Sequence, residues 1–493
     1  MTLLEQRIKA AGIDLTRSSD ILRRLNAGAY DHVQPVRASG IPVIDNETII
    51  DRTIPLERKI EDESYRRRMA DLAPEIPADR IGTASDGIRH LREDDLERLG
   101  VLLYPYVAYG ILNGGSATSY ADRKKNSAFD PDLFELYEPV FDSLSATLAG
   151  KPKGITPAFL RSDGTAGPSF LELKFRHLLL SGRRYTRLAK EMDIRPPETG
   201  FILPVFEMTS DATEDTLRNE YERYRKSPLL SEFSGTRTIL DTFHRVQPLL
   251  AALTHSSEGR PRRFFDRAFG TPETPLGLPG GHGQSFSVLA PVYRELAEMG
   301  KRFAYLGNVD NLGATVDPVG VALLALSDAQ AGFDFAFRTP VDVKGGVLIY
   351  DQTGHLNCAD IGPAISKDEV FHAEAGGRRI LFNCATGLFD LRYLCDNIDT
   401  IAEKLPMRIS DQEKDAGRYS QAEQVTWEII GMLDSFLVFG IDKYRRFLAA
   451  KMLSETLLTS GLLLEEATVF QPTAPLLHRG LANLLAETYS VER

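Results

Sequence analysis

Short apolar segments bounded by glycine or proline recur from Tyr106 onward, and this alternation most limits what the chain can fold into. Amphipathic stretches separate the segments. A strand and helix alternation of this kind predicts an α/β fold with a largely parallel sheet at its core. The predicted strands are Val107 to Leu112, Gly200 to Phe206, Phe303 to Val309, Gly346 to Tyr350 and Arg379 to Phe382.

Helical patterns precede and interrupt these segments. Asp20 to Ala27 is predicted to be a helix with Ser18 or Ser19 as its N-cap and Gly28 as its stop, within a helical N-terminal region over residues 1–105. Pro131 to Leu148 carries apolar residues at helical spacing. Residues 121–150 are therefore interpreted as a helical insertion in a domain formed by residues 106–440.

A short C-terminal region, residues 441–493, is expected to complete the fold. Met432 to Leu437 and Leu476 to Leu485 are each predicted to lie within a helix, with a short apolar turn at Leu462 to Leu464.

The charge balance argues against two classes of partner. A formal net charge of −11 and a pI near 5.5 disfavour non-specific binding to nucleic acid or to an acidic membrane, because both need a basic surface. Any phosphate that the protein binds must therefore meet a local cluster of positive charge.

Cysteine usage fits a reducing cytoplasm. Cys358, Cys384 and Cys395 are odd in number and lack metal-ligand spacing, so neither disulfides nor a zinc site is expected. The first residues are charged where a secretory signal would be apolar, and the longest apolar run, Val319 to Leu326, is too short to cross a membrane. We expect a cytoplasmic location and no membrane partner.

Paired glycines follow the first predicted strand, in the segment Leu112-Asn113-Gly114-Gly115-Ser116-Ala117-Thr118. Glycines at this place let backbone N–H groups approach a nucleotide without an intervening side chain. A tight turn is the alternative interpretation. The segment is neither a GxGxxG fingerprint nor a GxxxxGK[ST] phosphate loop.

Three lysines stand beside glycine or in an apolar frame, namely Lys153 in KPKG, Lys344 in DVKGG and Lys451 in RFLAAK. Each is able to bring a point charge to a phosphate. The alternative for each is a solvated surface charge, because lysine is mostly exposed.

Asp310 follows an apolar run and should emerge at the carboxyl end of a strand, where open α/β sheets bind ligands. A carboxylate there suits Mg²⁺, which prefers oxygen ligands and shares them with substrate phosphates. A helix cap is the alternative role. His282 lies in a glycine frame, Gly280 to Gly283, from which it is able to donate to a phosphate or a sugar hydroxyl; a plain turn is the alternative.

Taken in order, nine motifs resemble those of the UDP-glucose pyrophosphorylase family, the UTP:glucose-1-phosphate uridylyltransferases. The resemblance runs from about Tyr106 to Leu464 and is densest at Asn308 to Asp317, NVDNLGATVD. The other motifs are LNGG (112–115), PKG (152–154), FLEL (170–173), MTSDATEDT (208–216), GHG (281–283), DVKGG (342–346), FN (382–383) and RFLxxK (446–451).

The resemblance implies a Rossmann-like, GT-A-like nucleotidyltransferase with a mixed sheet flanked by helices, and Mg²⁺ as cofactor. It implies UTP and a sugar 1-phosphate as substrates, with a UDP-sugar and pyrophosphate as products. The implied roles are metal binding by Asp310; phosphate contacts by Lys153, Lys344 and Lys451; nucleotide contacts by Leu112, Asn113, Gly114, Gly115, His177, Met208 and Gly281; and sugar contacts by His282, Asn308 and Asn383.

Three departures from the family pattern bear on the substrates. Ser116, Ala117 and Thr118 replace a GxGT loop, and about thirty residues separate that loop from PKG where the family has a few. A glutamine that reads uracil in the family falls at His177, and a glutamate of its LEIA stretch falls near Cys358. The base and the sugar are therefore open, with glucose 1-phosphate as the default and N-acetylglucosamine 1-phosphate as a variant.

A second hypothesis is a nucleotide-sugar binding protein without turnover. The altered loop favours it, whereas Asp310 and the three lysines favour the enzyme. The insertion is interpreted as a solvated charge run, with a lid that uses Arg123, Lys124 and Lys125 as the alternative. Because 42 residues follow Lys451, the C-terminal β-helix through which family members often assemble is not expected, and the oligomeric state is left open.

Overall fold

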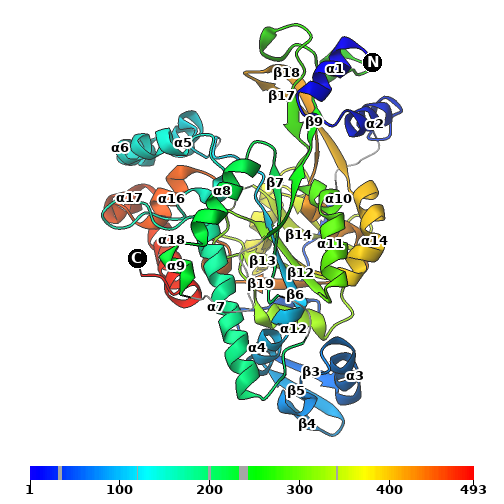
Figure 1. Ribbon diagram of the computed structural model, residues 1–493, viewed down its shortest axis with the longest axis vertical. Helices are drawn as coiled ribbons and strands as arrows, with labels where there is room; N and C mark the ends of the chain where they lie inside the picture. Colours follow the sequence, from blue (N-terminus) through cyan, green and yellow to red (C-terminus); the bar gives the residue numbers. More distant parts are fainter. Residues whose placement is uncertain are drawn as a thin grey trace.

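The protein is built around an eleven-stranded mixed sheet (Figure 1). The computed structural model describes residues 1–31, 36–118, 120–197, 201–232, 242–339, 342 and 344–492. Strands run in the order β2 (Ile49–Asp51), β19 (Phe436–Ile441), β13 (Ala331–Phe337), β16 (Leu381–Asp390), β12 (Phe303–Asn308), β6 (Val107–Leu112), β7 (Val205–Ser210) and β8 (Thr242–Gln247). The predicted α/β class with a mostly parallel central sheet is confirmed.

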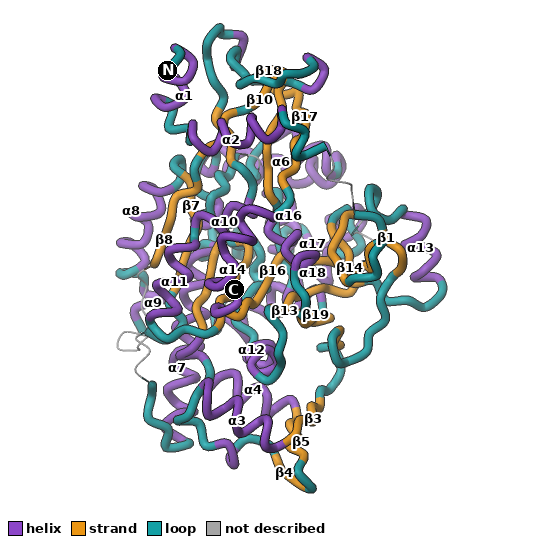
Figure 2. The backbone as a smooth tube through the Cα atoms, turned by 90° about the vertical axis from the view of Figure 1, so that its right-hand side faces the viewer, coloured by secondary structure: helices purple, strands orange, loops and turns teal. Residues whose placement is uncertain are grey.

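Two parallel blocks meet at one antiparallel strand. β12, β6, β7 and β8 are parallel to one another, as are β13, β19 and β2, and β16 runs antiparallel between the blocks. β14 (Gly346–Asp351) extends from β16 and carries β15 (Leu356–Asp360) and β1 (Ala38–Gly40). With α13 (Lys367–Ala375) these strands form a lobe at one side of the sheet (Figure 2).

Helices cover both faces of the sheet, which explains why its central strands read as continuous apolar runs. One face packs against α10 (Ser285–Val288), α11 (Ala290–Glu298) and α14 (Leu391–Lys404). The other packs against α4 (Glu93–Leu102), α6 (Pro131–Leu148), α7 (Phe170–Glu191), α12 (Pro318–Ala325), α16 (Leu453–Ser460), α17 (Leu464–Phe470) and α18 (Ala474–Asn483).

Smaller elements complete the chain. In the described part of the chain, three minor sheets contain β3 (Glu57–Glu61), β4 (Thr83–Ser85) and β5 (Ile88–Arg92); β9 (Leu249–Ala251) and β11 (Gly277–Pro279); and β10 (Leu253–Thr254), β17 (Met407–Lys414) and β18 (Gly417–Gln424). The remaining α-helices are α1 (Leu3–Ala10), α2 (Leu15–Asn26), α3 (Asp62–Leu72), α5 (Arg123–Phe129), α8 (Glu214–Tyr224), α9 (Pro228–Ser231) and α15 (Lys443–Arg446).

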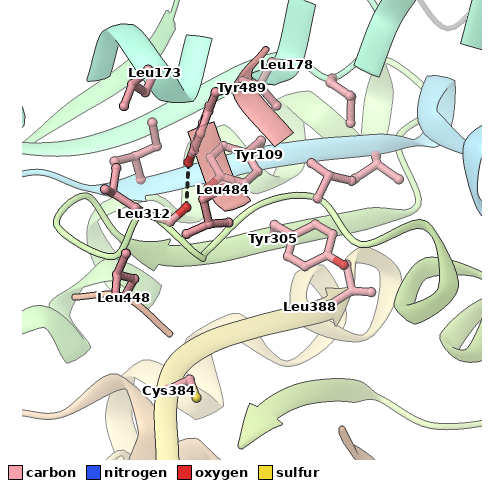
Figure 3. Close-up of a cluster of buried hydrophobic side chains, with 14 of the residues drawn as sticks. Tyr109, Leu173, Leu178, Tyr305, Leu312, Cys384, Leu388, Leu448, Leu484 and Tyr489 are labelled. Carbon is pink, nitrogen blue, oxygen red and sulfur yellow. Dashed lines mark hydrogen bonds between the residues drawn. The ribbon is translucent and has the colours of Figure 1, made fainter. Parts of the chain in front are cut away.

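The C-terminal residues enter the main core (Figure 3). A π-helix, Leu484–Tyr489, follows α18 and buries Tyr489 completely. The Tyr489 hydroxyl donates to the carbonyl of Leu312 at 2.5 Å, in the loop after β12. The end of the chain therefore helps to fix the loop that contains Asp310.

Several predicted elements are confirmed and two need correction. β6 and α6 have the predicted bounds, and Leu476 to Leu485 is helical. Met432 to Leu437 is wrong as a helix, because Phe436 onward pairs with β13 and β2 as β19. The cap of α2 is Asp14, whose carboxylate accepts from Arg17 N at 2.9 Å, whereas Ser18 lies inside the helix.

Two further predictions concern the strand after Gly200 and the helical N-terminal region. The strand after Gly200 begins only at Val205, and Gly200 itself lies outside the described residues. The N-terminal hundred residues contain the predicted helices, and their strands β1 and β2 also join the central sheet. Among the described residues, no helix is long and apolar enough to cross a membrane.

Gly100 provides a test of how tightly the N-terminal region is docked. It lies where α4 crosses α12, and a Cβ at this position would lie 1.7 Å from the carbonyl oxygen of Pro318. Because two backbones would have to separate, Gly100→Ala should lower the free energy of unfolding by about 1–3 kcal/mol in denaturant titrations. Arg98→Ala, on the exposed side of the same helix, is the control and should change it by less than about 0.5 kcal/mol. Equal effects of the two substitutions would contradict the close packing.

Candidate active site

The glycine loop after β6 offers open space at a strand end. Asn113 N donates to Met208 O at 2.9 Å, which ties the loop to the end of β7. A Cβ at Gly115 would meet no heavy atom within 4 Å, whereas one at Gly114 would lie 3.4 Å from the Gln247 side chain. The backbone at Gly115 is therefore exposed, and its role as a nucleotide loop stays a prediction.

The insertion returns the chain to this loop. Lys153 N donates to Gly115 O at 3.0 Å, and Ala117 N donates to Lys151 O at 2.6 Å. The roughly thirty residues that separate LNGG from PKG therefore fold outward as α5 and α6 and leave the two motifs side by side. Within the insertion, Arg123 pairs with Glu138 and Asp142.

Asp310 joins two of the three predicted lysines. Lys153 Nζ lies 2.6 Å and Lys451 Nζ 2.9 Å from the same oxygen, Asp310 Oδ2. The three residues come from separate parts of the chain and form a cluster that we call the Asp310 site. Lys344, the third lysine, is exposed before β14, and no described contact joins it to this site.

The charges in the Asp310 site are strongly coupled. Burial alone would raise the pKa of Asp310, yet the ammonium groups of Lys451 and Lys153 outweigh burial and lower that pKa to about 2. Burial lowers the pKa of Lys153 despite its carboxylate partner. Lys153 and Lys451 bring two ammonium groups to this carboxylate, and Glu455 also acts on Lys153. Ammonium groups that lie together in this way suit a polyphosphate.

The Asp310 site fits a Mg²⁺ ion whose ligands come partly from the protein and partly from substrate phosphates and water. Asp310 Oδ1 is buried without a hydrogen-bond donor in the described structure, so one carboxylate oxygen is available to a cation. No group of three or more His, Cys, Asp or Glu residues suited to a metal occurs among the described residues. Mg²⁺ commonly takes one or two protein carboxylates and completes its shell with phosphates and water.

His282 is held in one tautomer beside the Asp310 site. Thr426 N donates to His282 Nδ1 at 3.0 Å, which leaves the proton on Nε2. Burial and then the charge of Lys451 lower the pKa of His282 to about 4, so the ring is neutral. Gly281 makes this turn possible, with φ of 79° and a hypothetical Cβ only 2.3 Å from Gln424 O.

The two predicted asparagines lie at strand positions. Asn308 ends β12 and is paired with Leu112 at the end of β6. Asn383 lies in β16, where its Oδ1 accepts from Ala385 N at 2.9 Å. In the DVKGG motif, Asp342 pairs with Lys443, and Val343 is not among the described residues.

His177 contacts a different part of the loop after β12. It is buried in α7, and its Nε2 accepts from Val316 N at 3.1 Å. Burial lowers its pKa to about 3. Lys174, one turn earlier, donates to the carbonyls of Asn311 and Ala314, each at 2.5 Å. Sequence reasoning missed Lys174, although a lysine within the apolar run FLELKFRHLLL was a visible signal.

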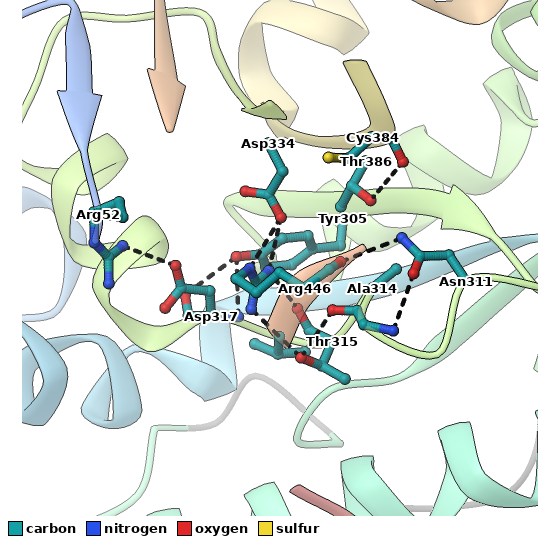
Figure 4. A network of polar contacts seen from close by, with 12 residues as sticks. Arg52, Tyr305, Asn311, Ala314, Thr315, Asp317, Asp334, Cys384, Thr386 and Arg446 are labelled. Carbon is teal, nitrogen blue, oxygen red and sulfur yellow. Dashed lines mark hydrogen bonds and ion pairs between the residues drawn. The ribbon is translucent and has the colours of Figure 1, made fainter. Parts of the chain in front are cut away.

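A second buried charge network fixes the other end of this loop (Figure 4). Arg446 pairs with Asp334 of β13 at 2.8 Å and donates to Thr315 O at 3.2 Å. Asp317 pairs with Arg52 at 2.9 Å. The loop is therefore anchored from the sheet, from α15 and from the N-terminal region at once.

Two solved structures have a fold similar to that of this chain. The uridine diphosphate N-acetylglucosamine pyrophosphorylase of Trypanosoma brucei has a TM-score of 0.58 at 16% identity, over 98% of this chain and 84% of that chain. A UDP-glucose phosphorylase from Trypanosoma brucei has a TM-score of 0.56 at 16% identity, over 93% and 78%.

Sequence comparison finds similarity to one protein family over part of the chain. The model of the UDPGP family, described as UTP--glucose-1-phosphate uridylyltransferase, matches residues 271–478. A probable UTP--glucose-1-phosphate uridylyltransferase of Schizosaccharomyces pombe is 34% identical over 198 residues, 40% of this chain and 33% of the relative. The enzyme of that name from Astragalus penduliflorus is 24% identical over 268 residues, 53% and 52%. Residues 271–478 are therefore similar to the UDPGP family.

These alignments span between about a third and about half of the length of the curated relatives. The family match begins after the glycine loop and Lys153. The hydrogen bonds that join Lys153 to Gly115 and to Asp310 are therefore independent support for placing these residues in one site.

Glu207 is a buried carboxyl that sequence reasoning missed. It lies in β7 beside Met208, accepts a hydrogen bond from Tyr221, and has its pKa raised to about 7 by burial. Below pH 7, Glu207 is mostly protonated and adds little negative charge behind the glycine loop. The sequence places it next to a predicted nucleotide contact, but its raised pKa follows from burial, to which the charge of Glu214 adds.

The raised pKa of Glu207 makes a pH-dependent contribution to stability. A pKa of about 7 in the folded protein exceeds the ordinary value near 4.3 in the unfolded chain, so this contribution is present in acid and is lost as pH rises to 7. From pH 5 to pH 8, Glu207→Gln should gain about 2–3 kcal/mol of unfolding free energy relative to wild type. Glu222→Gln, at an exposed position of α8, should gain none. A pH-independent difference for Glu207→Gln would refute the raised pKa.

Proposed function

We propose that the protein is a uridylyltransferase that forms a UDP-sugar and pyrophosphate from UTP and a sugar 1-phosphate. The observation that supports this proposal most strongly is that Lys153 and Lys451 both form ion pairs with Asp310. The exposed backbone of Gly115 lies next to them. The similarity of residues 271–478 to the UDPGP family model supports the same reaction.

The reaction needs no protein nucleophile. An oxygen of the sugar phosphate forms a bond to the α-phosphorus of UTP, and the bond from that phosphorus to the leaving oxygen breaks, so that pyrophosphate departs. Bound Mg²⁺ would neutralise phosphate charge, with Asp310 as its protein ligand. Lys153 and Lys451 would release Asp310 in part and bind the phosphates, which positions the reactants and stabilises the developing charge.

The other contacts are proposed around this centre. Nucleotide contacts are assigned to Leu112, Asn113, Gly114, Gly115, Met208 and Gly281, and sugar contacts to His282, Asn308 and Asn383. His282 Nε2–H is suited to donate to a sugar or phosphate oxygen, because its other nitrogen is already occupied. Lys344 is retained as a phosphate contact that would need to move. His177 would act on the nucleotide through the backbone of Val316.

Glucose 1-phosphate is the default sugar, and N-acetylglucosamine 1-phosphate is the variant to test beside it. Solved structures of similar fold are described as acting on either sugar nucleotide. A panel of sugar 1-phosphates with UTP, and of nucleoside triphosphates with the preferred sugar, would identify both substrates.

Pyrophosphate release provides the test of the reaction. With UTP, Mg²⁺ and the preferred sugar, we expect Asp310→Ala and Lys153→Ala each to lower kcat/KM by about 10²–10³-fold, because each removes a charge from the reacting phosphates. Lys190→Ala, an exposed lysine of α7, is the matched control and should retain full activity. Removal of Mg²⁺ by a chelator should abolish release.

The non-catalytic alternative has its own signature. Ser116 to Thr118 in place of the family's glycine loop is the observation that favours it. UDP-sugar binding with no pyrophosphate release from any pair of substrates would reject the enzyme and support this alternative. Full activity in Asp310→Ala would instead reject the assignment of the metal ligand.

A further inference from the structure

One residue of β16 has a backbone conformation that alanine rarely adopts. Ala385 has a φ of 51°, in the left-handed region, although it lies inside β16 (Leu381–Asp390). In this region the Cβ of a residue other than glycine crowds the backbone, so the conformation costs free energy. Residues that keep such strain gather at functional sites, where the surrounding structure fixes them.

A bulge in β16 contains Ala385. Along β13 the pairing advances by two residues, from Phe333 to Phe335, while along β16 it passes four, from Gly387 to Asn383. β16 therefore has two extra residues at this point. An irregularity of this kind changes the direction of the side chains next to it, and bulges are frequent beside active sites.

The bulge lies beside the end of β12, from which the chain continues to Asp310. Gly307 of β12 pairs with Thr386 of β16. A hypothetical Cβ at Gly307 would lie 3.8 Å from the carbonyl oxygen of Ala385, so the two backbones are adjacent. Ala385 therefore lies next to the strand end that carries Asn308 and leads to Asp310.

Hydrogen bonds on both sides of Ala385 hold the bulge. Ala385 N donates to Asn383 Oδ1 at 2.9 Å, and Ala336 N of β13 donates to the Cys384 sulfur at 3.1 Å. The Thr386 hydroxyl donates to Cys384 O at 3.4 Å (Figure 4). Because the neighbours of Ala385 have these partners, a change in its backbone conformation would break at least one of the bonds.

The bulge determines which group Asn383 presents to a ligand. Its amide oxygen accepts from Ala385 N, so the NH₂ group is the part of the amide that points away from this turn. A hypothetical Cβ at Gly346 would lie 3.8 Å from Asn383 Nδ2 and 2.7 Å from the Cys358 sulfur, so glycine keeps the space beside the NH₂ group open. Cys358 shares a hydrogen bond with Asn383. An NH₂ group has two N–H bonds, and the second is available to a ligand.

We propose that Ala385 is a positioning residue for the sugar, whose left-handed conformation holds the bulge that turns the NH₂ group of Asn383 toward an acceptor oxygen of the sugar. The inference rests on the proposed function, in which Asn383 contacts the sugar, and adds the direction of that hydrogen bond and the residue that sets it. Glucose offers hydroxyl oxygens and N-acetylglucosamine adds a carbonyl oxygen, and each is able to accept it. The amide of Asn383 is therefore fixed as a donor before a sugar binds.

Calorimetric titration of the full chain with UDP-glucose, UDP-N-acetylglucosamine and UDP tests the role of Ala385. A β-branched side chain is strongly disfavoured in the left-handed region, whereas asparagine, of similar size, tolerates it. Ala385→Val should therefore weaken the Kd of the preferred UDP-sugar at least tenfold and change the Kd of UDP less than twofold. Ala385→Asn and Ala385→Gly should retain both values within twofold.

Asp86 provides the matched control, because its φ is also 51° and it is exposed in the turn between β4 and β5. Asp86→Val should lower the temperature of thermal unfolding, as Ala385→Val does, and should bind every ligand as wild type does. Ala385→Gly should not lower that temperature, because the relief of strain offsets the freedom that glycine gains in the unfolded chain.

Asn383→Asp tests the direction of the hydrogen bond and remains informative if Ala385→Val fails to fold. Aspartate still accepts from Ala385 N but has no NH₂ group to donate. The Kd of the UDP-sugar should therefore weaken at least tenfold, and by more than the Kd of UDP. In Asn383→Ala/Ala385→Val the two effects should not add, since Ala385 acts through Asn383.

The proposal is overturned if Ala385→Val binds the UDP-sugars as wild type does, weakens UDP equally, or adds its full effect to that of Asn383→Ala. Unchanged binding of the UDP-sugar by Asn383→Asp would overturn the donor role. If wild type binds UDP-sugars and releases no pyrophosphate, the uridylyltransferase is rejected and the same titrations still decide the role of Ala385. A wild type that binds no UDP-sugar rejects both.

Discussion

The burial of the loop Val309 to Asp317 is the constraint on which the rest of the site depends. An irregular segment inside a protein must find partners for its backbone N–H and C=O groups. Lys174 supplies them from α7, Leu448 and Ala450 from the segment after α15, and Tyr489 from the C-terminus. Elements far apart in sequence therefore fix the Asp310 backbone before any substrate binds.

The two charge clusters at the ends of this loop differ in how exposed their side chains are. At one end, Lys451 is 60% exposed while its partner Asp310 is buried, so its ammonium is free to exchange one anion for another. At the other, the side chains of Arg446, Asp334, Arg52 and Asp317 are only 5–18% exposed, and removing any one would leave a largely buried charge unpaired. The first arrangement suits ligand exchange and the second suits rigidity.

Much of the fold could be predicted because its signals are local. β6, β12 and α6 have continuous or periodic apolar patterns, and they lie where predicted. Met432 to Leu437 failed because a short apolar run does not distinguish helix from strand until its neighbours are known. For the site, ordered motifs indicated Lys153, Lys451 and Asp310, whereas Lys174 and Glu207 owe their character to burial, which depends on the whole fold. The proposed roles of His177, Lys344 and the asparagines stay predictions.

The hydrogen bonds between residues 115–117 and 151–153 also make the insertion modular. The two ends of the insertion are joined by these hydrogen bonds. The number of residues between the ends therefore does not determine the shape of the glycine loop. The entropic cost of such a closure rises only slowly with length, by about 0.6 kcal/mol for each doubling. A change in the length of the segment between these paired ends would thus leave the glycine loop in place.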